Sequence, residues 1–307
     1  MILISKTSYR GILLLLMMGL GVSIESYAQG DVIDKNENHW VDSVYHSLTL
    51  EQRIAQLIFV RANYARKPYI QYIDTLITDY NIGGVVFFSG DPVSQVEQTN
   101  HWNSLARTPL LVAIDAEWGL GMRLSNSIKY PLQMTLGAIS DNNLIYAMGQ
   151  QIGDQCKRMG IHINFAPVVD VNSNPKNPVI GMRSFGQNPK LVAEKGDYYM
   201  KGLQSRDVIA SAKHFPGHGN TYMDSHYDLP VVNSALNVLK NNDLYPFQYL
   251  IENNVGSVMI AHLSVPALDD TKNLPSTLSH KIVTDYLIDS LAFNGLIITD
   301  GLDMKGV

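Results

Sequence analysis

Residues 141–171 read DNNLIYAMGQQIGDQCKRMGIHINFAPVVDV and join a helical pattern directly to a strand pattern. Asp141 has a side chain suited to a helix N-cap, and we expect the helix to run to about Met159, with Gly160 as its end. The apolar run Ile163–Val171 then predicts a buried strand. A short apolar strand next to an amphipathic helix is typical of the βα units of a parallel sheet.

The same alternation continues on both sides of this stretch. We expect further buried strands over Ile82–Ser89, Leu110–Asp115, Val208–His214, Ser257–Leu263 and Leu296–Asp300. The apolar run Ile54–Val60 is another strand candidate. Helices are expected over Val93–Ala106, Pro189–Ser205, Ala235–Asn253 and Ser279–Ala292.

Seven or eight strand–helix units in one chain indicate an α/β fold, a (β/α)8 TIM-type barrel rather than a doubly wound sheet. The sequence has neither a GxGxxG motif after its first strand nor a GxxxxGK[ST] motif, so a nucleotide-binding fold has no support. Val307 comes seven residues after the seventh strand candidate. We therefore expect a barrel that is truncated before its last strand.

The first 28 residues have the pattern of a secretory signal peptide. Lys6 and Arg10 supply positive charge, Gly11–Ile24 is a short apolar run, and Ser26-Tyr27-Ala28 offers small residues at a cleavage site. The apolar run is shorter than the roughly 20 residues that a membrane-spanning helix needs. We expect an exported protein, periplasmic or extracellular, with no stable membrane anchor after cleavage.

Composition limits the partners of the remaining chain. The formal net charge is −5 and no run of Lys or Arg builds a basic stripe, so nucleic acid is not an expected partner. Cys156 is the only cysteine, which excludes an internal disulfide and leaves stability to the core. The expected organisation is a signal peptide at 1–28, an N-terminal lead-in at 29–44 and one barrel over 45–307.

Polar residues gather where the predicted strands end. They are Asp115, Asp170, Lys213-His214, His262 and Asp300, each at or near the end of an otherwise apolar run. Charged groups in such places are costly unless they are paired or functional. Because the carboxyl ends of the strands carry the active site in barrels of this type, these residues together predict a catalytic rim.

The segment 213–230, KHFPGHGNTYMDSHYDLP, is the densest polar stretch. Asp224 lies two residues before His226, close enough for its carboxylate to orient the imidazole for proton transfer. A metal site made of His214, His218, Asp224 and His226 is an alternative, although the spacing lacks the H-x-H and H-E-x-x-H patterns. A purely structural loop is another.

Asp300 stands where the last predicted strand emerges into a loop, in the segment IITDGLDMKGV. Such a carboxylate can attack an anomeric carbon if a second group protonates the leaving oxygen. Asp303 is the competing carboxylate, and its position favours the helix that should follow.

These motifs resemble glycoside hydrolase family 3, specifically its bacterial β-N-acetylglucosaminidase (β-hexosaminidase) branch, over residues 45–307. The most specific match is KHFPGHG followed by DSH and a Pro. NFAPVVDV (164–171), the NPxxPVIGxRSFG pattern (174–186) and the ITDGLxMKG pattern (298–306) match as well. One departure is DAEWGLGMR (115–123), where Trp118 replaces a Gly of the pattern that the family often shows. We expect this tryptophan to reshape the substrate rim.

The resemblance implies the roles of particular residues. Asp300 would be the nucleophile, His226 the general acid/base and Asp224 its assistant. The positions that bind sugar in the family correspond to Asp115, Arg123, Arg183, Lys213 and His214. The family's chemistry implies no metal and no organic cofactor.

The implied activity is that of a retaining exo-β-N-acetylglucosaminidase that acts by double displacement on peptidoglycan fragments (muropeptides) or related amino-sugar oligosaccharides. A family 3 β-glucosidase is one alternative, although those relatives take their acid/base from a second domain and lack the DSH motif. A catalytically silent barrel that only binds peptidoglycan and a metal-dependent hydrolase are the others. A preference for β-glucosides would indicate the β-glucosidase, and absence of turnover would indicate the binding barrel. Loss of activity in EDTA would indicate the metal-dependent hydrolase.

Overall fold

The computed structural model describes residues 35–63 and 67–307. The signal peptide predicted at 1–28 lies outside these residues. Leu50–Val307 form one compact unit, and helix α2 (Lys35–Ser47) belongs to a separate unit. Within the described ranges, no helix combines the length and the apolar character needed to cross a membrane.

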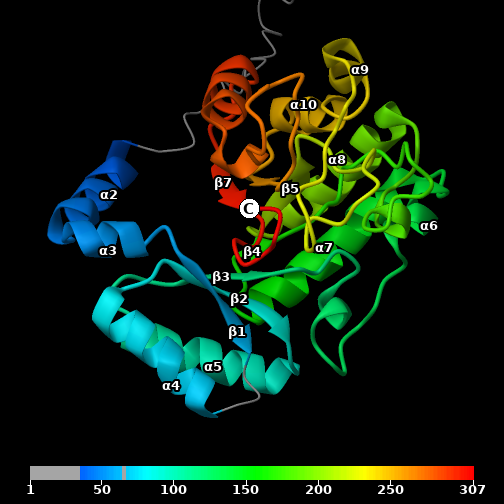
Figure 1. The fold of residues 1–307 in the computed structure, drawn as a ribbon. Coiled ribbons are helices and arrows are strands. Elements are labelled where there is room, and N and C mark those ends of the chain that lie inside the picture. The colour runs from blue at the N-terminus through cyan, green and yellow to red at the C-terminus, as the bar shows by residue number, and fades with distance from the viewer. Residues whose placement is uncertain (1–34, 64–66) are drawn as a thin grey trace, which may run out of the picture. The chain divides into compact units, whose positions relative to one another are not determined.

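A curled parallel sheet forms the centre of the larger unit (Figure 1). Its seven strands pair in chain order, so each strand lies next to the one that precedes it in sequence. The strands are β1 (Phe59–Asn63), β2 (Gly84–Ser89), β3 (Leu111–Ile114), β4 (Ile163–Asn164), β5 (Ile209–Phe215), β6 (Ser257–Ile260) and β7 (Leu296–Thr299). The architecture confirms the predicted TIM-type barrel, and no eighth strand joins β7 to β1 among the described residues.

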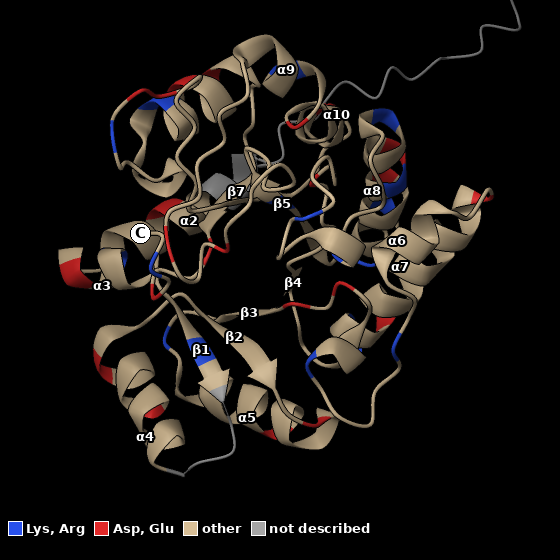
Figure 2. Ribbon diagram, turned by 45° about the vertical axis from the view of Figure 1, so that its right-hand side comes forward, with Lys and Arg blue, Asp and Glu red and all other residues tan. Residues whose placement is uncertain are grey.

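Helices connect the strands on the outer face of the sheet. The α-helices are α3 (Leu50–Ala55), α4 (Lys67–Thr75), α5 (Pro92–Leu105), α6 (Gln133–Gly137), α7 (Asn142–Arg158), α8 (Pro189–Gln204), α9 (Leu236–Asn241) and α10 (Tyr245–Glu252). Short helical turns are η1 (Leu76–Tyr80), η2 (Leu120–Met122), η3 (Gly181–Arg183) and η4 (Ser276–Leu278), and the wider η5 (Lys281–Ser290) precedes β7. The strands are mostly uncharged, and most charged residues lie on helices and loops (Figure 2).

Local signals at the start and end of α7 act as predicted. The Asp141 carboxylate accepts a hydrogen bond from the Asn143 amide at 3.0 Å, which satisfies one of the free N–H groups of the first turn. Gly160 follows the helix with a φ of 69°, a left-handed conformation that glycine adopts without strain.

Three expected elements differ most from the structure, while the strand expected over Ser257–Leu263 ends at Ile260 and the helix expected over Ser279–Ala292 is the wider η5. The run Ile54–Val60 is divided, because α3 continues to Ala55 and β1 begins only at Phe59. The helix expected over Ala235–Asn253 is two helices, since Pro246 near the start of α10 cannot continue the hydrogen-bond ladder of α9.

The third difference is β4, which is regular only over Ile163–Asn164 rather than as far as Val171. Pro167 has no N–H for a ladder. The segment nevertheless runs beside β5, because the Val169 amide donates to the Lys213 carbonyl at 2.9 Å.

The inner face of the sheet determines which side chains reach the mouth of the barrel. Alternate residues of the strands pack into one apolar cluster around Val86, Ala113, Ile163, Phe165 and Met259, with Phe59, Phe88, Leu111, Ile209, Leu296 and Ile298 against it. Side chains alternate between the two faces of a strand. The residues two positions after Phe59, Ala113 and Ile298 are Arg61, Asp115 and Asp300. On β5, Ser211 and then Lys213 follow Ile209 at the same spacing of two. These polar side chains therefore follow the apolar layers at the carboxyl ends of the strands.

Candidate active site

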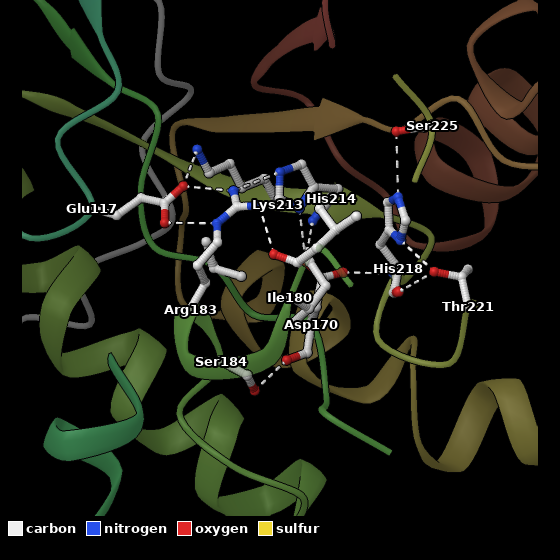
Figure 3. Close-up of polar contacts among 12 residues, drawn as sticks. Glu117, Asp170, Ile180, Arg183, Ser184, Lys213, His214, His218, Thr221 and Ser225 are labelled. Atoms are coloured by element: carbon white, nitrogen blue, oxygen red, sulfur yellow. Dashed lines mark hydrogen bonds and ion pairs between the residues drawn. The ribbon is translucent and has the colours of Figure 1, made fainter. Parts of the chain in front are cut away.

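Lys213 is the buried centre of a charged network at the mouth (Figure 3). Its ammonium donates to the Asp115 carboxylate at 2.7 Å and pairs with the Glu117 carboxylate at 2.8 Å. The side chains of Lys213 and Glu117 are only 2% and 1% exposed. A charge buried to that extent is stable only when polar partners replace the water that it has lost. Here the ammonium and the carboxylates are each other's partners.

Two arginines complete this network. Arg183, at the end of η3, holds Glu117 with two parallel hydrogen bonds, from Nε at 3.0 Å and from Nη2 at 2.6 Å. Arg123 donates to the second oxygen of Asp115 at 2.7 Å, and its guanidinium lies 4.9 Å from the centre of the Phe88 ring. The two-pronged pairing fixes the plane of the Arg183 guanidinium as well as its position.

The carboxylates of the network are held in the charged form. Burial raises the pKa of Glu117, but the charges of Lys213 and Arg183 outweigh burial and keep the pKa below its usual range. Burial likewise raises the pKa of Asp115, and Lys213 and Arg123 bring it below the ordinary value. Burial lowers the pKa of Lys213, whereas the two carboxylates raise it above the ordinary value. The network is therefore fully ionised at neutral pH.

Neutralising Glu117 tests how far the network stabilises the fold. The Glu117→Gln variant leaves Lys213 and Arg183 buried with one carboxylate fewer, so we expect the free energy of unfolding to fall by about 3–5 kcal/mol. Denaturant unfolding of the purified protein measures this. The matched control is Asp303→Asn, which removes an exposed pair with Arg61 and should cost about 1 kcal/mol or less. Equal losses in the two variants would contradict the stabilising role of the network.

The same ionisations predict a dependence of stability on pH. Asp115 and Glu117 have folded-state pKa values below the ordinary 3.8 and 4.5. Their contribution is therefore complete above those ordinary values and is lost as the pH falls through the lower folded-state values. We expect the free energy of unfolding to decline below about pH 4.5, with a shallower decline in Glu117→Gln. Identical declines in the parent protein and the variant would contradict this assignment.

Asp170 joins the histidines of the 213–230 segment to the charged network. Its carboxylate accepts from the His214 ring at 2.7 Å, from the His214 amide at 3.1 Å and from the His218 amide at 2.6 Å. The Arg183 Nη2 atom lies 3.3 Å from His214 Nε2. Because a guanidinium only donates, Nε2 accepts, and the His214 proton resides on Nδ1 facing Asp170. Burial raises the pKa of Asp170, but the interactions with His214 outweigh burial and bring this pKa below its ordinary value.

Asp224 and His226 form a second, more exposed group. The Asp224 carboxylate accepts from the His226 ring Nδ1 at 2.7 Å and from its amide at 2.9 Å. Burial raises the pKa of Asp224, but the hydrogen bonds from His226 bring it below its ordinary value. The His226 side chain is 61% exposed, and its Nε2 atom makes no hydrogen bond within the described residues. An imidazole held on one side and open on the other can exchange a proton with a bound molecule.

Asp300 begins the loop that follows β7. Its amide donates to the Ile260 carbonyl at 2.9 Å, and its carboxylate accepts from the Gly301 amide at 2.8 Å. Buried His262 donates from Nε2 to the Gly301 carbonyl at 3.0 Å and contacts Thr277 Oγ1 at 2.9 Å through Nδ1. Gly301, the residue that follows the carboxylate, is therefore held at both its amide and its carbonyl. Asp303, the competing carboxylate, is 67% exposed and paired with Arg61.

The loops that carry Asp300 and His226 meet directly. The amide of Gly306 donates to the carbonyl of Ser225 at 3.0 Å, and Ser225 lies between Asp224 and His226 in sequence. A side chain at Gly306 would come within 2.9 Å of that carbonyl and 3.1 Å of His262 Cβ. The absence of a side chain at Gly306 thus allows the two loops to approach.

The structure brings the predicted residues together in three groups. Asp115, Arg123, Arg183, Lys213 and His214 belong to one connected network, Asp224 and His226 form a pair, and Asp300 lies on the adjoining loop. Within the described residues, no hydrogen bond or ion pair joins the Asp300 carboxylate to either of the other groups. The hydrogen bond from Gly306 to Ser225 is the link between the loop of Asp300 and the loop of the Asp224–His226 pair.

The histidines considered as metal ligands have separate partners. His214 contacts Asp170, His218 contacts Thr221 at 2.7 Å, and His226 contacts Asp224. Over residues 35–63 and 67–307, no group of three His, Cys, Asp or Glu side chains is arranged to hold a metal ion.

Glu117 is the network member that sequence reasoning did not single out. The motif DAEWGLGMR points to Asp115, Arg123 and Trp118. Only the buried pairing of Glu117 with Lys213 and Arg183 shows why an acid is required at its position. Trp118 is half-buried, and its carbonyl accepts from the Tyr130 amide at 2.9 Å.

Comparisons with known proteins agree with this arrangement. The family model "Glycosyl hydrolase family 3 N terminal domain" matches residues 49–307. The chain is 36% identical to "Beta-hexosaminidase A" of Pseudoalteromonas piscicida over 258 residues, which cover 76% of this chain and 43% of that protein. It is 28% identical to "Beta-N-acetylglucosaminidase/beta-glucosidase" of Cellulomonas fimi over 285 residues, 90% of this chain and 50% of that protein.

A solved structure shows the same fold at similar identity. The family 3 β-N-acetylglucosaminidase from Paenibacillus sp. str. FPU-7 superposes with a TM-score of 0.78 at 36% identity, over 85% of this chain and 50% of that one. The chain thus spans about half the length of these relatives. With a family model over most of its length and the matching barrel, the chain belongs to glycosyl hydrolase family 3 and contains the family's N-terminal domain.

Proposed function

We propose that the protein is a retaining exo-β-N-acetylglucosaminidase. The observation that supports this proposal is the backbone hydrogen bond from Gly306 to Ser225. It joins the loop that begins with the strand-end carboxylate of Asp300 to the loop that carries the open imidazole of His226. Glycoside hydrolysis needs one group to attack or stabilise the anomeric carbon and another to protonate the leaving oxygen. The name of the Paenibacillus relative, a β-N-acetylglucosaminidase, supports an N-acetylglucosamine substrate, and the name of the Pseudoalteromonas relative, a β-hexosaminidase, supports a hexosamine.

The reaction proceeds in two displacements. An oxygen of Asp300 forms a bond to the anomeric carbon while the bond to the glycosidic oxygen breaks, and the proton on His226 passes to that oxygen. Neutral His226 then takes a proton from water, whose oxygen attacks the same carbon and displaces the Asp300 carboxylate. Two inversions return the original anomeric configuration. Asp224 accepts from Nδ1, so Nε2 performs both proton transfers.

The buried network supplies the sugar-binding side chains. His214 contributes by holding Arg183 in place, because its two ring nitrogens contact Asp170 and Arg183. The hydroxyls of the ring that reacts hydrogen-bond to Asp115, Arg123, Arg183 and Lys213. Their mutual ion pairs orient them before a substrate arrives, so little reorganisation is required on binding.

The substrates we propose are terminal β-linked N-acetylglucosamine units of peptidoglycan fragments, including muropeptides, or of related oligosaccharides. The signal peptide pattern supports a periplasmic or extracellular site of action. Intact-mass measurement of protein secreted by a host tests export: a mature chain that begins at Gln29 is expected, and an uncleaved chain would contradict it.

Hydrolysis of nitrophenyl glycosides tests the activity. We expect nitrophenyl β-N-acetylglucosaminide to be turned over with a kcat/KM well above that of the β-glucoside, both with and without EDTA. The reverse preference would favour a β-glucosidase, a candidate supported by the double name of the Cellulomonas relative. Absence of turnover on both would favour a binding barrel, and loss in EDTA would favour metal-dependent hydrolysis.

A further inference from the structure

Ser225 is buried in an otherwise exposed loop. Its neighbours Tyr222, Met223, His226 and Tyr227 are exposed, whereas Ser225 itself is only 3% exposed. A small polar residue in that position needs hydrogen-bond partners inside the protein. Its carbonyl accepts from Gly306, and its hydroxyl lies 3.4 Å from the Nε2 atom of His218 (Figure 3).

His218 is itself held from several sides. Its amide donates to Asp170 at 2.6 Å, and its carbonyl accepts from the side chains of Asn177 at 2.8 Å and Thr221 at 3.0 Å. Burial lowers the pKa of the His218 imidazole, which favours the neutral ring. The ring therefore has a fixed place relative to the buried network.

The hydrogen-bond pattern determines the direction of the contact with Ser225. The Thr221 hydroxyl uses its proton on the His218 carbonyl and accepts from Asn177 Nδ2 at 3.1 Å. The 2.7 Å contact between Thr221 Oγ1 and His218 Nδ1 then requires the ring to donate. Nε2 is left as an acceptor, and the Ser225 hydroxyl is the donor that faces it.

From this geometry we propose that His218 and Ser225 are positioning residues, which fix the loop of the general acid/base against the floor of the sugar-binding site. The inference rests on the proposed function. Asp170 connects the sugar-binding network to His218, because its carboxylate accepts a hydrogen bond from the His214 ring in that network and another from the His218 amide. The 3.4 Å separation is longer than an ordinary hydrogen bond, and such contacts in catalytic sites shorten when substrate binds.

The role of the contact is to align His226 with the glycosidic oxygen. Ser225 precedes His226 directly, so a shift of Ser225 moves the imidazole with it. A displacement of about 1 Å in a catalytic group can cost on the order of 10²-fold in rate. The loss of rate should affect substrates whose glycosidic bond breaks only when the leaving oxygen is protonated. A leaving group that is stable as an anion departs without a proton, so its substrates should be affected little.

The test is the dependence of kcat/KM on the leaving group in Ser225→Ala. We expect a loss of about 10-fold on N-acetylglucosaminides with alkyl or sugar leaving groups and less than about 2-fold on the dinitrophenyl glycoside. A plot of log kcat/KM against leaving-group pKa should become steeper. Ser225→Thr, which keeps a hydroxyl, should restore most of the loss. Tyr222→Phe is the matched control, since it removes an exposed hydroxyl from the same loop.

A double variant isolates the contact. In the His218→Gln background, Ser225→Ala should cause little further loss if both act through one interaction. If the two changes lowered kcat/KM independently, so that their fold losses multiplied in the double variant, the proposal would be overturned. A Ser225→Ala plot of log kcat/KM against leaving-group pKa with the slope of the parent protein would overturn it as well. If His218→Gln does not fold, the single serine variants still give the answer. Failure of the proposed function is a separate result, since the parent protein would then not hydrolyse N-acetylglucosaminides.

Discussion

Asp300→Ala should lower kcat by at least about 10⁴-fold on every glycoside, whatever its leaving group. The alanine cannot form the bond to the anomeric carbon, so the first displacement has no nucleophile. Within the described ranges the carboxylate accepts one hydrogen bond, from the Gly301 amide, so its loss should affect the fold little. Steady-state kinetics with nitrophenyl and dinitrophenyl N-acetylglucosaminides, together with a thermal unfolding curve, measure both effects.

Asp303→Ala is the control for this experiment. Asp303 lies three residues further along the same loop and pairs with Arg61 at the surface. We expect its kcat to stay within about 5-fold of the parent value, as for a surface pair of small energy. A large loss in Asp303→Ala with a normal rate in Asp300→Ala would reverse the assignment of the nucleophile.

His226→Ala should have the second largest effect, and its size should depend on the substrate. We expect a loss of about 10² to 10⁴-fold for poor leaving groups and a much smaller loss in kcat/KM for dinitrophenyl leaving groups. The imidazole is exposed, and among the residues that the structure describes its ring is hydrogen-bonded only to Asp224, so the change removes a proton carrier rather than a structural support. Comparison of kcat/KM across a series of aryl glycosides measures the dependence.

Asp224→Asn gives an intermediate variant. The amide keeps the shape of the side chain but lacks the charge of the carboxylate that accepts from Nδ1, so the loss of activity should follow the same leaving-group trend with a smaller size. A His226→Ala enzyme with normal kinetics on poor leaving groups would contradict the acid/base assignment.

Periodicity along the chain was sufficient to predict the fold. The strands over Ile82–Ser89, Leu110–Asp115 and Val208–His214 are compact apolar runs, and each becomes a strand within one or two residues of the expected start. Boundaries failed where a local backbone constraint competed with apolar character. Pro167 and Pro246 are the examples, because neither can donate a hydrogen bond to a continuing element.

The site could be predicted only in part. Asp115, Lys213 and Asp300 were found because a charge at the end of an apolar strand is unusual, and the inner-face alternation of the strands explains why they share the mouth. Arg123, Arg183 and the role of the DSH motif came from family resemblance. Spacing alone does not show which loops approach each other.

The contacts that hold the site could not be read from the sequence. Glu117 pairs with Arg183, 66 positions away, and His262 reaches the Gly301 carbonyl, 39 positions away. Each contact depends on neighbouring strands that bring distant segments together. The sequence has no signature that separates the buried acid Glu117 from an exposed one, and the position of His262 at the end of an apolar run does not show its partner.

The central claim is that Asp300 becomes bonded to the sugar while His226 moves the proton. Treatment of the protein with a 2-acetamido-2-deoxy-5-fluoro glycosyl fluoride, followed by proteolysis and mass spectrometry, tests it directly. We expect one sugar adduct per active protein molecule, on Asp300 within the segment IITDGLDMK. An adduct on another residue, or sugar released with inverted anomeric configuration and no adduct, would contradict the account.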